Sequence, residues 1–77
     1  MVFTKEFLKA TPVEVNRARE SLEIYLHVFD QSMADFATWL HTSETTLNDH
    51  IDRATIVELK KLEDACFAFC KERLAAS

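Results

Sequence analysis

The chain has 77 residues and a net charge of −4, and 48% of its residues are hydrophobic while 29% are charged. A chain of this length forms one domain at most, and its apolar content excludes an intrinsically disordered tail. Its longest uncharged apolar run, residues 65–70, is far too short to span a membrane. Glycine is absent and proline occurs once, which disfavours β-hairpins and predicts an all-α fold whose helices end at polar residues.

The N-terminal segment carries two aromatic side chains, Phe3 and Phe7, four positions apart. This spacing suits either one helical turn or an extended arm laid on the core. The pattern of a secretory signal, a basic start followed by an apolar segment, does not occur there. We therefore expect a cytoplasmic protein that does not enter a membrane.

The first clear helix is predicted over residues 12–29. Thr11 is suited to be its N-cap, Pro12 stands at the first helical position, and Glu14 completes a Thr-x-x-Glu capping box. One side of this helix has the spacing of a core face, formed by Val15, Ala18, Leu22, Tyr25, Leu26 and Phe29. The opposite side carries a second apolar stripe for which a lone domain has no use, formed by Val13, Ile24 and Val28.

Two short helices are predicted next, over residues 32–41 and 44–53. Ser32 with Asp35 three residues later marks the start of the first, and Ser43 or Thr42 can cap the second. The apolar seam between the two helices is expected to be formed by Phe36, Ala37, Leu40, Leu47 and Ile51.

A long C-terminal helix is predicted over residues 56–75. Thr55 and Glu58 repeat the capping box, although no true helix breaker precedes them, so a fusion with the helix at 44–53 remains an alternative. The apolar arc of the C-terminal helix covers roughly 200°, about twice the width that packing on one side requires. We therefore expect the chain to self-associate as a homodimer, the simplest symmetric assembly, through Ile24, Val28, Ile56, Phe67 and Leu74.

The stretch 32–53 has the organisation of a helix-turn-helix, in which two short amphipathic helices are joined by a tight turn. Residues 36–51 resemble the helix-turn-helix regulators, and residues 46–51 (TLNDHI) are similar to the T-V-x-x-H-I run in the DNA-binding domain of quorum-sensing-type activators. The Thr-Pro-x-Glu start at Thr11 is similar to that family as well. The family usually has glycine where this chain has His41, and an aliphatic residue in place of Thr42. The resemblance spans about twenty residues and implies a helix-turn-helix fold with DNA binding in transcription regulation. The four predicted helices and their capping signals together indicate one compact all-α domain.

The outward face of the helix at 44–53 is acidic. At about 100° per residue, Thr45, Asn48, Asp49 and Asp52 point outward together. Residues 31–58 hold one basic and five acidic groups, and a surface of that sign repels phosphate and attracts basic partners. The sequence therefore favours a small regulator that acts by protein–protein interaction, an inhibitor or antirepressor-like factor whose acidic face binds a basic surface of its target.

The alternative is a transcriptional regulator that binds DNA as a dimer through the same helix. Asn48 could read an adenine edge and Asp49 could accept a hydrogen bond from a cytosine amine. Phosphate contacts would require convergence of the basic residues near the first helix and near the junction of the last two, which are Lys9, Arg17, Arg19, Arg53, Lys60 and Lys61. A third class, a purely structural assembly subunit, is also compatible with the sequence.

Trp39 lies on the flank of the helix at 32–41, beside Asp35. It either covers the edge of the core or serves as an aromatic anchor for a partner. The predicted partner-binding residues are therefore Trp39, Thr45, Asn48, Asp49 and Asp52.

Cys66 and Cys70 lie four positions apart on one face of the last helix. Two thiolates at this spacing can supply half of a zinc site, with His27, His41 or His50 as the remaining ligands, but no histidine has partner spacing. Buried, reduced thiols are favoured, and we expect no metal or cofactor. His50 is expected to be partly buried and bonded to a nearby carbonyl. Because no Ser/His/Asp set has suggestive spacing and a chain without glycine cannot form the known phosphate-binding loops, we do not expect an enzyme.

Overall fold

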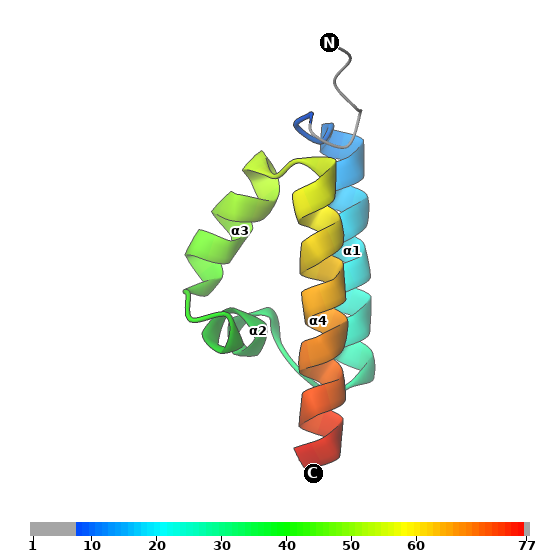
Figure 1. Cartoon of the computed structure of the whole chain (residues 1–77), viewed down its shortest axis with the longest axis vertical. Coiled ribbons are helices and arrows are strands. Elements are labelled where there is room, and N and C mark those ends of the chain that lie inside the picture. The colour runs from blue at the N-terminus through cyan, green and yellow to red at the C-terminus, as the bar shows by residue number, and fades with distance from the viewer. Residues whose placement is uncertain (1–7, 77) are drawn as a thin grey trace.

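Four α-helices make up the computed structural model, which describes residues 8–76 (Figure 1). They are α1 (Pro12–Val28), α2 (Met33–Trp39), α3 (Glu44–Arg53) and α4 (Ile56–Ala76). The predicted all-α fold of four helices is confirmed, and α3 and α4 are separate helices. Helix α2 is shorter than predicted at both ends. The expectation for Phe3 and Phe7 lies outside the described residues.

The helix starts are fixed by side-chain caps that the sequence encodes locally. At α1, the Glu14 amide donates to Thr11 Oγ1 over 3.3 Å, and Glu14 Oε1 accepts from the Thr11 amide over 3.1 Å. The same reciprocal capping box forms at the starts of α2 and α4. Helix α3 has a single cap, in which Ser43 Oγ accepts from the Thr46 amide over 3.1 Å. These bonds satisfy amide groups that the first helical turn leaves without an intrahelical partner.

Helices α1 and α2 end at polar residues with left-handed backbone, Asp30 (φ 57°) and His41 (φ 62°). After α2, the Thr42 amide donates to the Ala37 carbonyl over 2.9 Å, and an equivalent bond of 2.8 Å closes α1. This is the Schellman arrangement, which glycine usually completes. In a chain without glycine, an aspartate and a histidine take that conformation instead, and His41 therefore ends α2 before residue 41.

Helices α1 and α4 lie side by side and run in the same direction, while α2 and α3 form the connection on one side of this pair (Figure 1). The common direction places the starts of both long helices at one end. There an antiparallel bridge joins Lys9 to Thr55, and the Ala10 amide donates to the Ala54 carbonyl over 3.0 Å. This bridge, which the sequence did not predict, ties the segment before α1 to the link between α3 and α4.

The core lies between the α1–α4 pair and the α2–α3 connection. Its largest fully buried side chains are Phe36, Phe69, Leu22, Ile51, Cys66 and Cys70. Most residues of the predicted core faces are buried, while Phe29 and Leu40 are half-buried and pack against the core. One prediction is wrong, because Tyr25 is 41% exposed. Its position at the margin of the α1 stripe turns it toward the flank of α4, where its ring meets Phe67 edge-on at a centroid distance of 6.0 Å.

Candidate functional site

The outward side of α3 brings together four of the predicted partner-binding residues. Thr45, Asp49 and Asp52 are exposed, and Asn48 is half-buried. Glu44 is exposed in the first turn of the same helix, where a carboxylate is favoured by the helix dipole. We refer to Glu44, Thr45, Asn48, Asp49 and Asp52 as the α3 face.

One carboxylate of the α3 face is engaged within the chain. Arg19 of α1 reaches across to α3, and its Nη2 lies 2.9 Å from Asp52 Oδ1 and 3.3 Å from the Asn48 carbonyl oxygen. Because both side chains remain in contact with solvent, such a pair contributes only about 0–1 kcal/mol to stability. It nevertheless cancels one negative charge, so the acidity of the α3 face rests on Glu44 and Asp49.

The basic residues that a DNA-binding role requires do not form one patch beside the α3 face. Arg19 is paired with Asp52. Arg17 and Lys60 line a surface pocket between α1 and α4, and position 17 lies about 200° around α1 from position 19, which faces α3. Lys9 lies near Asp52, where both line a small pocket. The structure thus places Arg17 and Lys60 together between α1 and α4, and Lys9 and Arg19 beside α3.

Trp39 lies apart from the α3 face, in the contact between α2 and α4. Its ring centroid is 5.6 Å from that of Phe69 and 6.3 Å from that of Phe36. Its Nε1 donates to Glu72 Oε2 over 3.1 Å. The indole therefore covers the edge of the core with its polar atom satisfied, which is one of the two roles that the sequence left open.

A second surface runs along the seam between α1 and α4. Exposed apolar side chains line it, and they include four of the residues predicted for self-association together with Tyr25: Ile24, Tyr25, Val28, Phe67 and Leu74. We call these five residues the seam stripe. The fifth predicted residue, Ile56, is half-buried in the pocket between α1 and α4 and packs against the core.

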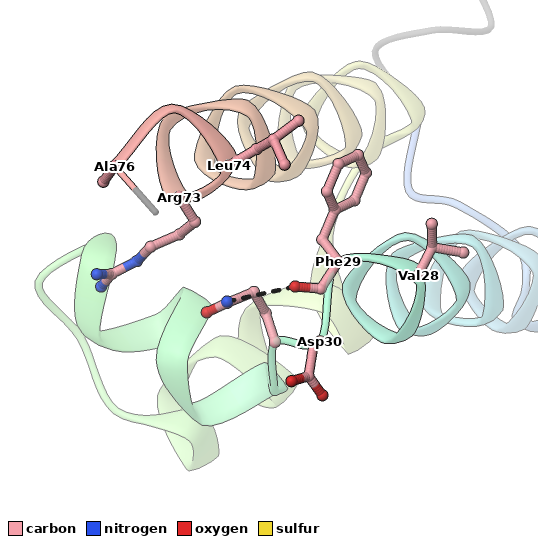
Figure 2. A pocket seen from close by; sticks show the side chains of 7 residues that line it. Val28, Phe29, Asp30, Arg73, Leu74 and Ala76 are labelled. Carbon is pink, nitrogen blue, oxygen red and sulfur yellow. Dashed lines mark hydrogen bonds between the residues drawn. The ribbon is translucent and has the colours of Figure 1, made fainter.

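Figure 2 shows the end of the seam stripe nearest the C-terminus, where Leu74 of α4 and Val28 of α1 stand on either side of Phe29. Phe29 is the C-cap of α1 and packs against the core, and its carbonyl accepts from Gln31 Nε2 over 3.4 Å. The hollow there is open and is lined by backbone turns and side chains of both signs.

The two cysteines are buried, free thiols, as the sequence favoured. Burial raises the pKa of Cys66 to about 12, with a further contribution from the neighbouring Cys70 thiol. Burial also raises the pKa of Cys70, whose Sγ lies 3.9 Å from the Tyr25 carbonyl oxygen. Both groups therefore stay protonated and act as core side chains. Among residues 8–76, no cluster of three or more His, Cys, Asp or Glu side chains could hold a metal ion.

The expectation for His50 was wrong. The side chain is 48% exposed, and its Nε2 lies 3.4 Å from Glu58 Oε2, a carboxylate rather than a carbonyl. The separation of α3 from α4 explains this result, because the capping box at Thr55 holds Glu58 within reach of the last turn of α3. His50 belongs to the link between these helices.

Comparisons with known proteins add no assignment. The chain matches no protein-family model, no curated protein and no solved structure. Within the part of the chain that the structure describes, no helix has the length and apolar character needed to cross a membrane. The functional argument therefore rests on the α3 face and the seam stripe.

Proposed function

We propose that this is a small cytoplasmic regulatory protein that acts by binding another protein rather than by catalysis. In this proposal it is an inhibitor or antirepressor-like factor, and the α3 face binds a basic surface of its target. The observation that carries the proposal is that Glu44 and Asp49 are exposed on α3, whereas Arg17 and Lys60 line a pocket between α1 and α4. The two free thiols suit a reducing compartment.

Electrostatics supports a basic protein over DNA as the ligand. A DNA-bound module neutralises several phosphates, and this electrostatic attraction supplies most of its affinity for DNA. Here Arg19 is engaged by Asp52, while Asp49 stands exposed in the middle of α3. An acidic face of this kind accelerates encounter with a basic surface and repels a phosphate backbone.

A second candidate function is a helix-turn-helix regulator that binds DNA as a dimer. One observation favours it: His41 adopts φ 62° at the turn position that the resembled family fills with glycine. The turn thus keeps the backbone conformation that glycine would supply. In this candidate, Asn48 and Asp49 would read base edges in the major groove.

The charge reversal Asp49→Lys separates the two candidates, because it acts in opposite directions on them. Binding to a basic protein should weaken about tenfold or more, since an attraction becomes a repulsion. Binding to duplex DNA should instead tighten, because a positive charge is added beside the phosphates. Glu20→Lys is the matched control, as it makes the same change from an acid to lysine on an exposed position of α1 that belongs to neither the α3 face nor the seam stripe.

The experiment first captures partners of the tagged full-length chain, and then titrates the purified partner against wild type, Asp49→Lys and Glu20→Lys at several salt concentrations. The same three proteins are titrated against a random-sequence duplex library. Sequence-selective DNA binding by the wild type at physiological salt, lost in Asn48→Ala, would overturn the proposal. Asp52→Ala is unsuitable for this test, because it also removes the partner of Arg19.

A further inference from the structure

The seam stripe exposes more apolar side chain than an isolated small domain needs. Val28 is 71% exposed, Leu74 63%, Ile24 57% and Phe67 46%. Val28 and Leu74 line one hollow, Phe67 lines another with Tyr25, and Ile24 lies one turn before Val28 on α1. Exposed apolar side chains gathered along two neighbouring helices in this way favour an interaction site.

Charges of opposite sign flank Phe67 along α4. Glu63 lies four residues before Phe67 on α4, and Lys71 lies four residues after it, so all three share one side of the helix. Glu63 and Asp64 line the same hollow as Tyr25 and Phe67. Lys71 Nζ lies 5.4 Å from the centroid of the Phe67 ring. Phe67 is thus flanked by two acids on one side and a base on the other.

We propose that a second copy of this chain covers the seam stripe, with the two α4 helices antiparallel about a two-fold axis near Phe67. In this arrangement each residue before Phe67 faces the residue equally far beyond it in the other copy. Glu63 then faces the partner's Lys71, and Lys71 faces the partner's Glu63. A parallel arrangement would oppose Glu63 to Glu63 and Lys71 to Lys71, and like charges in close contact are unfavourable.

The dimensions of the surface suit a small dimer interface. The 17 residues of α1 rise over about 26 Å, and two adjacent helices span about 20 Å in width, which gives at most about 520 Å² per partner. This area is below the roughly 800 Å² per partner of a standard interface, so the dimer should be weak. A two-fold interface is built from the same patch on both copies, which is what the charge pattern around Phe67 allows. The dimer is independent of what the α3 face binds.

Sedimentation equilibrium of the full-length chain, over a range on the order of 1–200 μM, tests this proposal. The wild type should dimerise within this range. Phe67→Glu, which brings two carboxylates to the axis, should weaken dimerisation by about a hundredfold or more. A wild type that remains monomeric throughout the range overturns the proposal.

A charge swap tests the antiparallel arrangement. Lys71→Glu and Glu63→Lys should each weaken dimerisation about tenfold, because each change creates two repulsive contacts per dimer. The double variant restores both pairs and should dimerise about as well as the wild type. Lys61→Glu is the control, since it changes an exposed lysine of α4 away from the stripe and should have little effect. A double variant that is helical by circular dichroism yet no better than the single variants overturns the arrangement, as does an equal loss in Lys61→Glu.

Discussion

Replacing His41 with glycine should stabilise the protein. His41 ends α2 with φ 62°, a conformation that crowds the Cβ atom of any residue other than glycine. Its side chain is exposed, so the substitution removes no buried contact. The backbone bonds that follow, including the 2.9 Å bond from the Thr42 amide to the Ala37 carbonyl, do not depend on the side chain at position 41.

The change in the free energy of unfolding is the difference between two opposing contributions. Relief of left-handed strain contributes about 1–2 kcal/mol in favour of glycine. The greater freedom of glycine in the unfolded chain offsets about 0.4–1 kcal/mol of this gain. The net stabilisation is therefore roughly 0.5–1 kcal/mol, which in a domain of this size raises Tm by about 2–8 °C.

Thermal and urea denaturation of His41→Gly, monitored by circular dichroism, measure the effect at a fixed protein concentration, because self-association would shift Tm. Asp30→Gly should give a smaller gain, since aspartate tolerates the left-handed region better than most residues. Thr42→Gly is the matched control at the neighbouring position, whose φ is not positive, and it should lower Tm. A Tm for His41→Gly at or below that of the wild type would refute the assignment of strain to this turn.

Two further predictions follow from the ionisable groups. Burial raises the pKa of Cys66 to about 12 and also raises the pKa of Cys70. Neither thiol of the native protein should therefore react with a thiol reagent at about pH 8, whereas both should react in denaturant. Rapid labelling of the native chain would contradict their burial. The pKa of Glu58 is lowered from 4.5 by hydrogen bonds from the backbone and hydroxyl of Thr55, so its contribution to stability is present above that value and is lost as the pH falls through the lower folded-state pKa. The urea midpoint should therefore drop on acidification, and less steeply in Glu58→Gln; identical pH profiles for the two proteins would rule this contribution out.

The parts of the fold that the sequence predicted are those encoded over a few residues. The starts of α1, α3 and α4 agree with the prediction because Thr11, Ser43 and Thr55 each cap a helix whose first turn they directly precede. The separation of α3 from α4 follows from the Thr55 cap at the start of α4. The end of α2 was placed too late because the sequence has no glycine there, and histidine gives no comparable signal for a left-handed residue.

The contacts that the sequence did not predict join residues far apart in the chain. Arg19 and Asp52 are each ordinary exposed charges on their own helices, and only the packing of α1 against α3 makes them partners. The bridge between Lys9 and Thr55 is a single pair, too short to produce an alternating pattern. The exposure of Tyr25 also depends on a contact between distant residues, because it is set by the side of α1 on which α4 packs.

The positions of the two surfaces determine how the two proposals combine. The hollow containing Tyr25 and Phe67 is lined only by α1 and α4, whereas α3 packs on the side of α1 that carries Arg19. Dimerisation through the seam stripe therefore leaves both α3 faces open to solvent. A dimer with two such faces could engage a symmetric, basic target at two points, and the second contact would gain from the effective concentration set by the first. Phe67→Glu should then weaken binding to a dimeric target more than binding to its isolated subunit, while Asp49→Lys should weaken both. Equal effects of Phe67→Glu on the two targets would show that the α3 faces act singly.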